Sequence, residues 1–156
     1  MRLRDILSEE LIKIPLENTE KEKIIEELVD VLHQAKKVDN EKKVLKAVLE
    51  REKVMSTGVG DGVAIPHGKA EGVKGIVGAL GITPKAVDFQ SLDSKPVQLI
   101  FLLVGQRDLT GPHLKALSRI SRLMHRPQFR SELLSAKTPQ EAMKAIAREE
   151  EKCFEM

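Results

Sequence analysis

Residues 97–104 read VQLIFLLV, a run that is apolar on both faces of an extended chain. A strand of this kind lies in the middle of a sheet that helices cover on both sides. The run is too short to span a bilayer as a helix, which needs about 20 apolar residues. We therefore expect a central strand here and no direct insertion of the chain into a membrane.

Two helices are predicted before the first long strand. Apolar residues recur at the helical period over about 20–35, and again from near Asp39 up to the glycines at 58–62. Thr19 followed by Glu22 has the spacing of a capping box, which would begin the first of these helices. Beyond the glycines the apolar residues no longer recur at the helical period, which indicates that the helices end there.

Strands are predicted in the middle of the chain. Residues 63–65 and 75–83 have extended character beside the run 97–104, and residues 11–14 could add an edge strand that Pro15 ends. With helices before and after these segments, the order predicts an α/β layered domain.

The last third of the chain is predicted to be helical. Three prolines stand where helices can begin, at Pro112, Pro127 and Pro139. We expect the last helix to end near residue 148 and the charged tail from about residue 150 to be disordered. A chain of 156 residues can bury one core, so we expect residues 1–156 to form a single domain.

Composition excludes several classes of function. Lys plus Arg number 26 and Asp plus Glu number 24, so the net charge of +2 gives no argument for binding nucleic acid or an anionic membrane. Four Phe, with no Tyr or Trp, leave almost no aromatic surface for stacking bases. The single cysteine, Cys153, excludes a disulfide framework and a zinc site made of cysteines. The acidic first residues do not fit a signal peptide, and we expect a cytoplasmic protein.

The densest unusual stretch is STGVGDGVAIPHGKA (56–70). It fails the dinucleotide fingerprint, because Val63 stands where a third glycine is needed. It also fails the P-loop pattern, since one residue too many separates Gly62 from Gly68 and Ala70 replaces the hydroxyl that would bind magnesium. We therefore expect no nucleotide cofactor.

His67 is the first candidate for chemistry. Pro66 restricts the backbone before it and Gly68 permits a sharp turn after it, so we expect His67 on a turn at the end of a short strand. An ordinary histidine pKa of about 6.5 leaves most imidazole neutral at pH 7, with a nucleophilic nitrogen. By its local sequence alone, His67 could equally be a solvated turn histidine.

Two further residues are candidates for holding an anion. His113 follows Pro112 near the start of a predicted helix, where free N–H groups favour an anion, although its phase with Leu117 also fits a histidine packed at the edge of the core. Arg51 ends the second predicted helix, just before the glycines. Its guanidinium could bind a phosphoryl group bidentately, or it could be a solvated arginine at a helix C-terminus.

The other histidines and basic residues carry weaker signals. His33 and His125 lie among charged residues, and no two histidines have the i, i+4 spacing of zinc ligands on a helix, so no metal site is predicted. A run of basic residues on nearly one helical face could be solvated or could dock an acidic partner. This run consists of Lys115, Arg119, Arg122, Arg126 and Arg130. Cys153 lies in an acidic tail, and we assign it no catalytic role.

Three segments together resemble a known family. STGVGDGVAIPHG, the strand pair that ends in VDFQSLDSKPVQLIFLLV, and HLKALSRISRLM resemble enzyme IIA of the fructose/mannitol class of the bacterial phosphotransferase system, a family that includes the nitrogen-type regulatory enzyme IIA. The similarity runs over about residues 3–148. It implies an α/β domain in which a mixed sheet is flanked by helices on both sides. The loop GQRDLTGP (105–112) departs from the pattern of many relatives, which have a proline soon after the strand.

The resemblance also implies a function. It implies that His67 accepts a phosphoryl group from the phosphohistidine of the carrier protein HPr, and that His113 and Arg51 help to hold that group. In a sugar transporter the group then passes to a cysteine of a IIB domain. In a nitrogen-type regulator the phosphorylation state controls binding to target proteins, and the sequence leaves both roles open. Phosphoryl transfer of this kind depends on positioning and charge, so neither role implies a metal or a cofactor. A third reading, a degenerate binding domain that is not phosphorylated, is disfavoured because both histidines are present.

Overall fold

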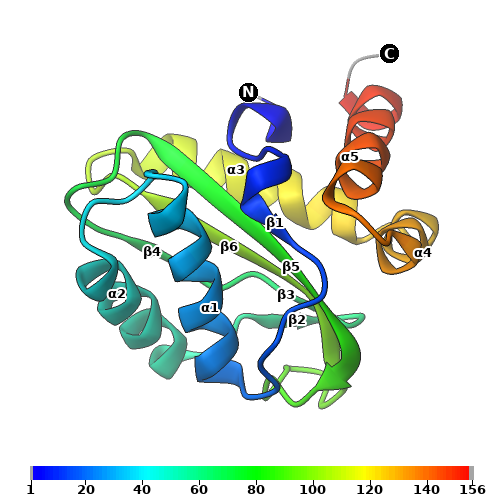
Figure 1. Ribbon diagram of the computed structural model, residues 1–156, viewed down its shortest axis with the longest axis horizontal. Coiled ribbons are helices and arrows are strands. Elements are labelled where there is room, and N and C mark those ends of the chain that lie inside the picture. The colour runs from blue at the N-terminus through cyan, green and yellow to red at the C-terminus, as the bar shows by residue number, and fades with distance from the viewer. Residues whose placement is uncertain (1, 155–156) are drawn as a thin grey trace.

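A mixed sheet of six strands forms the centre of the molecule in the computed structural model, which describes residues 2–154 (Figure 1). β5 (Ile76–Val87) and β6 (Val97–Gly105) pair antiparallel along its middle, and β1 (Ile12–Lys13) lies parallel to β5 at one edge. β6 is buried along nearly its whole length, as expected for an apolar run between two layers of helices. The predicted central strand, the edge strand and the α/β architecture are confirmed.

The strand on the other side of β6 is interrupted by a proline. β3 (Val63–Ala64) and β4 (His67–Lys69) both pair parallel with β6, and they share one unbroken register. Between them, Pro66 has no N–H to contribute to the ladder, and the N–H of Ile65 donates to the carbonyl of Thr57 at 3.0 Å. The interruption therefore removes hydrogen bonds without changing the direction of the chain.

Gly58 and Gly60 belong to the short strand β2 (Gly58–Gly60), which pairs antiparallel with β3. Two expectations for this region are wrong. His67 begins β4 instead of lying on a turn. Gly68 serves a different purpose from turning the chain, because a Cβ atom there would lie 3.0 Å from Cγ2 of Val48. A glycine at this position lets the strand approach the neighbouring helix closely.

Helices cover both faces of the sheet. In Figure 1, α1 (Lys21–Gln34) and α2 (Glu41–Val54) lie in front of the strands and α3 (Thr110–Met124) crosses behind them. α4 (Pro127–Ser135) and α5 (Pro139–Phe154) follow α3. None of the helices in the described part of the chain has the length and apolar character of a membrane span.

The predicted capping box of α1 is absent. No side chain caps this helix, so the expectation for Thr19 and Glu22 is wrong. The segment before α1 is held in another way, because the buried carboxylate of Glu27 accepts the backbone N–H groups of residues 17 and 18. A carboxylate nearly two turns inside the helix thus anchors the entering chain.

The expected disorder from about residue 150 is also wrong for residues 150–154, which form the end of α5. Glu150 is fully buried and accepts the N–H of Leu3 at 2.7 Å and Nε of Arg119 at 2.8 Å. A buried carboxylate needs such partners, and here they join α5 to α3 and to the N-terminal segment. Residues 155–156 lie outside the described residues.

Candidate active site

Two histidines from different layers of the fold face each other. His67 begins β4, and His113 lies in the first turns of α3. Their ring centroids are 5.7 Å apart and the ring planes are inclined at 55°. His67 is half-buried, whereas His113 is only 2% exposed. The outer imidazole is therefore open to a partner, and the inner one lies behind it.

A backbone hydrogen bond determines the tautomer of His67. Its Nδ1 lies 2.9 Å from the carbonyl oxygen of Ile65. Because a carbonyl oxygen only accepts, Nδ1 must carry the proton of the neutral ring and donate it. The lone pair is then on Nε2, which is the nucleophilic nitrogen.

The surroundings of His67 keep its imidazole neutral. Burial lowers the pKa of His67 below its ordinary value, and the positive charges of Arg51 and Lys69 lower it further, against the opposing effects of the Ile65 carbonyl and the Glu52 carboxylate. At neutral pH the ring therefore retains its lone pair, as a nucleophile requires.

His113 is buried without a hydrogen-bond partner. Within the described residues, neither ring nitrogen of His113 has one. Burial, followed by the nearby charges of His67 and Lys69, lowers its pKa from 6.5 to about 4. Buried polar groups are nearly always paired, so an imidazole with unpaired nitrogens beside the ring of His67 suggests a group that joins it during function.

The start of α3 offers fewer free N–H groups for an anion near His113 than the sequence suggested. α3 begins at Thr110, and the N–H of His113 already donates to the carbonyl of Leu109 at 3.0 Å. Helix geometry leaves the N–H groups of Thr110 and Gly111 without an intrahelical partner, while Pro112 has none. Any contact between His113 and an anion must therefore come from its imidazole.

Arg51 lies in the last helical turns of α2. Its Nη1 donates to the carbonyl of Met55 at 3.0 Å. Its positive charge is one of the causes that lower the pKa of His67, after burial. A guanidinium so placed adds positive charge to the surroundings of His67.

Lys69 was not found by sequence reasoning. It lies two residues after His67 on β4, so its side chain leaves the strand on the same side. Its Nζ donates to Oγ1 of Thr110 at 2.9 Å, at the start of α3, and its charge lowers the pKa of both histidines. The i, i+2 spacing from His67 would have indicated it, had the segment been predicted as a strand.

The family model for the phosphoenolpyruvate-dependent sugar phosphotransferase system, EIIA 2, matches residues 5–149. The chain belongs to this family. It is 38% identical over 138 residues to the PTS system fructose-specific EIIABC component of Bacillus subtilis, an alignment that covers 88% of this chain and 22% of that protein. The chain thus spans about a fifth of the length of that relative.

Two further EIIA relatives match along nearly their whole length. The nitrogen regulatory protein of Bradyrhizobium diazoefficiens is 34% identical over 151 residues, which cover 94% of this chain and 95% of that protein. The crystal structure of nitrogen regulatory protein IIA-Ntr from Neisseria meningitidis superimposes with a TM-score of 0.85 at 33% identity, covering 92% of this chain and 98% of the other. The resemblance to enzyme IIA is confirmed, for both the sugar-specific and the regulatory branch.

Three residues of the basic run 115–130 have partners within the fold of this EIIA domain. Arg119 pairs with Glu150, Arg126 pairs with Glu149, and Arg130 donates to the carbonyl of Met124 at 2.7 Å. These contacts join α3 and the start of α4 to α5, while Lys115 and Arg122 of the same run are exposed.

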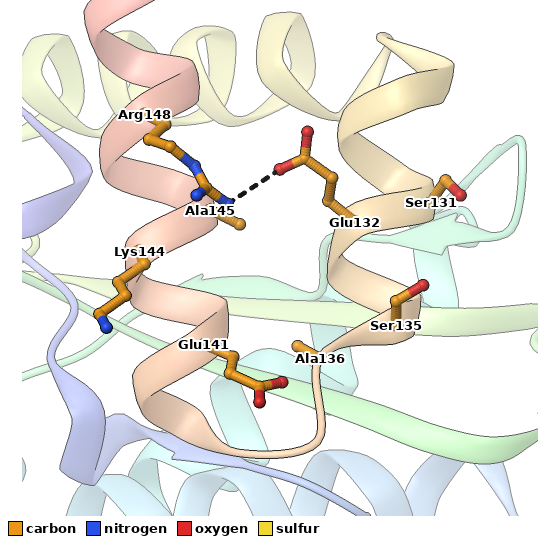
Figure 2. Close-up of a pocket in the computed structure, with 8 residues that line it drawn as sticks. All are labelled: Ser131, Glu132, Ser135, Ala136, Glu141, Lys144, Ala145 and Arg148. Atoms are coloured by element: carbon orange, nitrogen blue, oxygen red, sulfur yellow. Dashed lines mark hydrogen bonds and ion pairs between the residues drawn. The ribbon is translucent and has the colours of Figure 1, made fainter.

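A surface pocket of about 410 Å³ lies between α4 and α5 (Figure 2). Its charged walls include Glu132 and Arg148, paired at 3.5 Å, and it contains neither His67 nor His113. Small-molecule sites are usually enclosed, whereas this pocket is open to solvent. Among residues 2–154, no group of three or more His, Cys, Asp or Glu side chains is placed to hold a metal ion.

Proposed function

We propose that this EIIA domain is a phosphoryl carrier. It accepts a phosphoryl group from phospho-HPr on Nε2 of His67 and passes it to a cysteine of a IIB domain in phosphoenolpyruvate-dependent sugar uptake. The observation that carries the proposal is the hydrogen bond from Nδ1 of the half-buried His67 to the Ile65 carbonyl, which leaves the lone pair on Nε2. Membership of the EIIA family supports it.

The transfer needs no covalent machinery beyond one nitrogen. The lone pair of Nε2 attacks phosphorus, an N–P bond forms, and the bond from phosphorus to the donor imidazole breaks with its electron pair returning to the donor. Nδ1 of His67 keeps its proton, so the phosphorylated ring carries a positive charge that the Ile65 carbonyl partly offsets. In the second step a cysteine thiolate attacks phosphorus, and the N–P electrons return to Nε2.

Three side chains are suited to hold the transferred group. A phosphoryl group carries close to two negative charges, which Arg51 and Lys69 offset. His113 is neutral before transfer, because its pKa is about 4, and it still offers one ring N–H as a donor. Donors arranged before the reaction stabilise the charge on the oxygens without reorganising.

A regulatory role is the second candidate. The alignment with the nitrogen regulatory protein of Bradyrhizobium diazoefficiens covers nearly the whole of both chains, and the crystal structure of IIA-Ntr superimposes over 92% of this chain. In this role the same phosphohistidine forms, but the phosphorylation state of His67 decides whether the domain binds a target protein. The two roles differ only in the protein that the phosphorylated domain meets next, a IIB domain or a regulated target protein.

Reconstitution tests the proposal. The protein is incubated with phosphoenolpyruvate, enzyme I and HPr, and we expect one acid-labile, alkali-stable phosphoryl group on Nε2, located by ³¹P and ¹⁵N NMR. His67→Gln should abolish it, and labelling of that variant at the wild-type rate would contradict the assignment. Addition of a IIB domain then separates the roles, because loss of the label to its cysteine supports uptake and retention supports regulation.

A further inference from the structure

A buried ion pair lies next to the site but outside it. The carboxylate of Glu52, 8% exposed, is 2.8 Å from Nζ of Lys21. It also accepts two hydrogen bonds from Thr57, from the backbone N–H at 2.7 Å and from Oγ1 at 2.5 Å. Lys21 is itself largely buried and lies over the ring of Phe89, 5.1 Å from its centroid. Glu52 therefore joins α1, α2 and the segment that leads into β2.

A continuous series of hydrogen bonds runs from Glu52 to His67. Glu52 holds Thr57, the carbonyl of Thr57 accepts the N–H of Ile65 at 3.0 Å, and the carbonyl of Ile65 accepts Nδ1 of His67 at 2.9 Å. Residue 65 lies in the gap between β3 and β4 that Pro66 makes in the pairing with β6. Thr57 thus holds the residue whose carbonyl determines the tautomer of His67.

The same carboxylate also fixes the neighbouring cation. Arg51 precedes Glu52 in the last turns of α2, so the contact between Glu52 and Thr57 holds the end of that helix against the strand region. Glu52 is therefore connected to His67 by hydrogen bonds through Thr57 and Ile65, and to Arg51 by the backbone of α2.

We propose that Glu52, held by Lys21, is a positioning residue for phosphoryl transfer. Through Thr57 and Ile65 it keeps the proton of the His67 ring on Nδ1 and the lone pair on Nε2, and it holds the end of α2, which carries Arg51. This rests on the proposed function of His67. A displacement of about 1 Å in such a site can slow a reaction about a hundredfold.

Two variants test the connection at different points. Glu52→Gln removes the charge and leaves Lys21 unpaired, while Thr57→Val keeps the shape of the side chain and removes its hydroxyl. We expect each to slow single-turnover transfer from saturating phospho-HPr by about 10–100-fold, without a matching change in the apparent affinity for HPr. Thr57→Ser restores the hydroxyl and should bring the rate back to near the wild-type value.

Glu27→Gln is a matched control. Glu27 has the same 8% exposure, pairs with Nζ of Lys13 at 2.9 Å and also accepts backbone N–H groups, but it lies in α1 and is not connected to His67. Its loss should lower the melting temperature about as much as Glu52→Gln does, with the transfer rate unchanged. The difference in transfer rate between the two variants therefore measures the effect of positioning apart from the effect of stability.

The ¹⁵N shifts of the His67 ring give a readout that does not depend on transfer. In the wild type we expect protonated Nδ1 and bare Nε2, and in Thr57→Val a mixture of both tautomers. Wild-type rates and an unchanged tautomer in Thr57→Val would overturn the inference, even if Glu52→Gln fails to fold. If the wild type accepts no phosphoryl group, the proposed function fails, and the tautomer measurement still decides whether Thr57 positions the ring.

Discussion

Gly105 lies directly against the imidazole of His113, so that a Cβ atom at position 105 would come within 2.5 Å of Nδ1. Gly105 is the last residue of β6, which is buried along nearly its whole length, and His113 is on the helix that follows. The end of the central strand therefore determines how closely the inner histidine can approach the sheet and His67.

Gly105→Ala should displace His113 and slow phosphoryl transfer. The strand is buried and cannot move easily, so the imidazole must yield, and we expect the single-turnover rate to fall about tenfold or more. Gly111→Ala is the control, because no atom lies within 4 Å of a Cβ built there and the position is helical. It should keep the wild-type rate and raise stability by about 0.5–1 kcal/mol. Equal rates in both variants would show that the approach of His113 does not matter.

His113→Gln should reduce transfer more than stability. Loss of one donor that stabilises developing charge typically lowers a rate by about 10²–10³. We expect that reduction with the melting temperature changed by only a few degrees, measured by thermal melts and single-turnover transfer on the same sample. His125→Gln, at the exposed end of the same helix, should change neither. A lower melting temperature with an unchanged rate would instead make His113 a packing residue.

His113 should also make the stability of the folded protein depend on pH. Its folded pKa of about 4 lies below the unfolded value of 6.5, so between these pH values the unfolded chain binds a proton that the native state does not. The stabilisation is complete above about pH 6.5 and is lost as the pH falls toward 4, to a total of roughly 3 kcal/mol. Urea unfolding at several pH values checks this. In His113→Gln the free energy of unfolding should change less over the same range, and an unchanged slope would contradict the prediction.

The nucleophile should remain active in mildly acidic solution. The pKa of His67 is lowered, chiefly by burial, so protonation of Nε2 should occur at a pH below the ordinary value of about 6.5. An NMR titration of the His67 ring gives the midpoint directly. We expect the midpoint to move upward in Arg51→Gln, because a positive charge that opposes protonation is removed. A midpoint at or above 6.5 in the wild type would show that burial does not control this imidazole.

Glu150→Gln should lower stability without changing transfer. This carboxylate is fully buried and joins α5 to Arg119 and to the N–H of Leu3, so its loss leaves a guanidinium unpaired. Removing one partner of a buried pair costs about 3–5 kcal/mol, which denaturant unfolding measures easily. Glu132→Gln breaks the exposed pair with Arg148 and should change stability by less than about 1 kcal/mol. A similar loss of unfolding free energy in both variants would mean that the burial of Glu150 does not contribute to stability.

Local patterns in the sequence determined most of the architecture. The apolar run at 97–104 predicts a strand covered on both faces, and β6 has that environment because it removes these apolar positions from water. The helical periods over 20–35 and in the last third are confirmed for the same reason. His67 could be chosen as a candidate from the sequence because Pro66 and Gly68, on either side of it, restrict or free the backbone locally.

Only the tertiary structure decided how the site is assembled. The register of β3 and β4 along β6 places His67 on a strand, and therefore Lys69 beside it, although the local sequence Pro-His-Gly predicts a turn. The contact between His67 and His113 and the bond from Leu3 to Glu150 each join segments that are distant in the chain. The bond from Nδ1 of His67 to Ile65 and the bond from Thr57 to Glu52 are local, but they depend on how the strands around them pair. The energy and the chemistry of a buried charge or an unpaired imidazole depend on the groups that folding places around it. Many of those groups are distant in the chain, so residue spacing does not predict them.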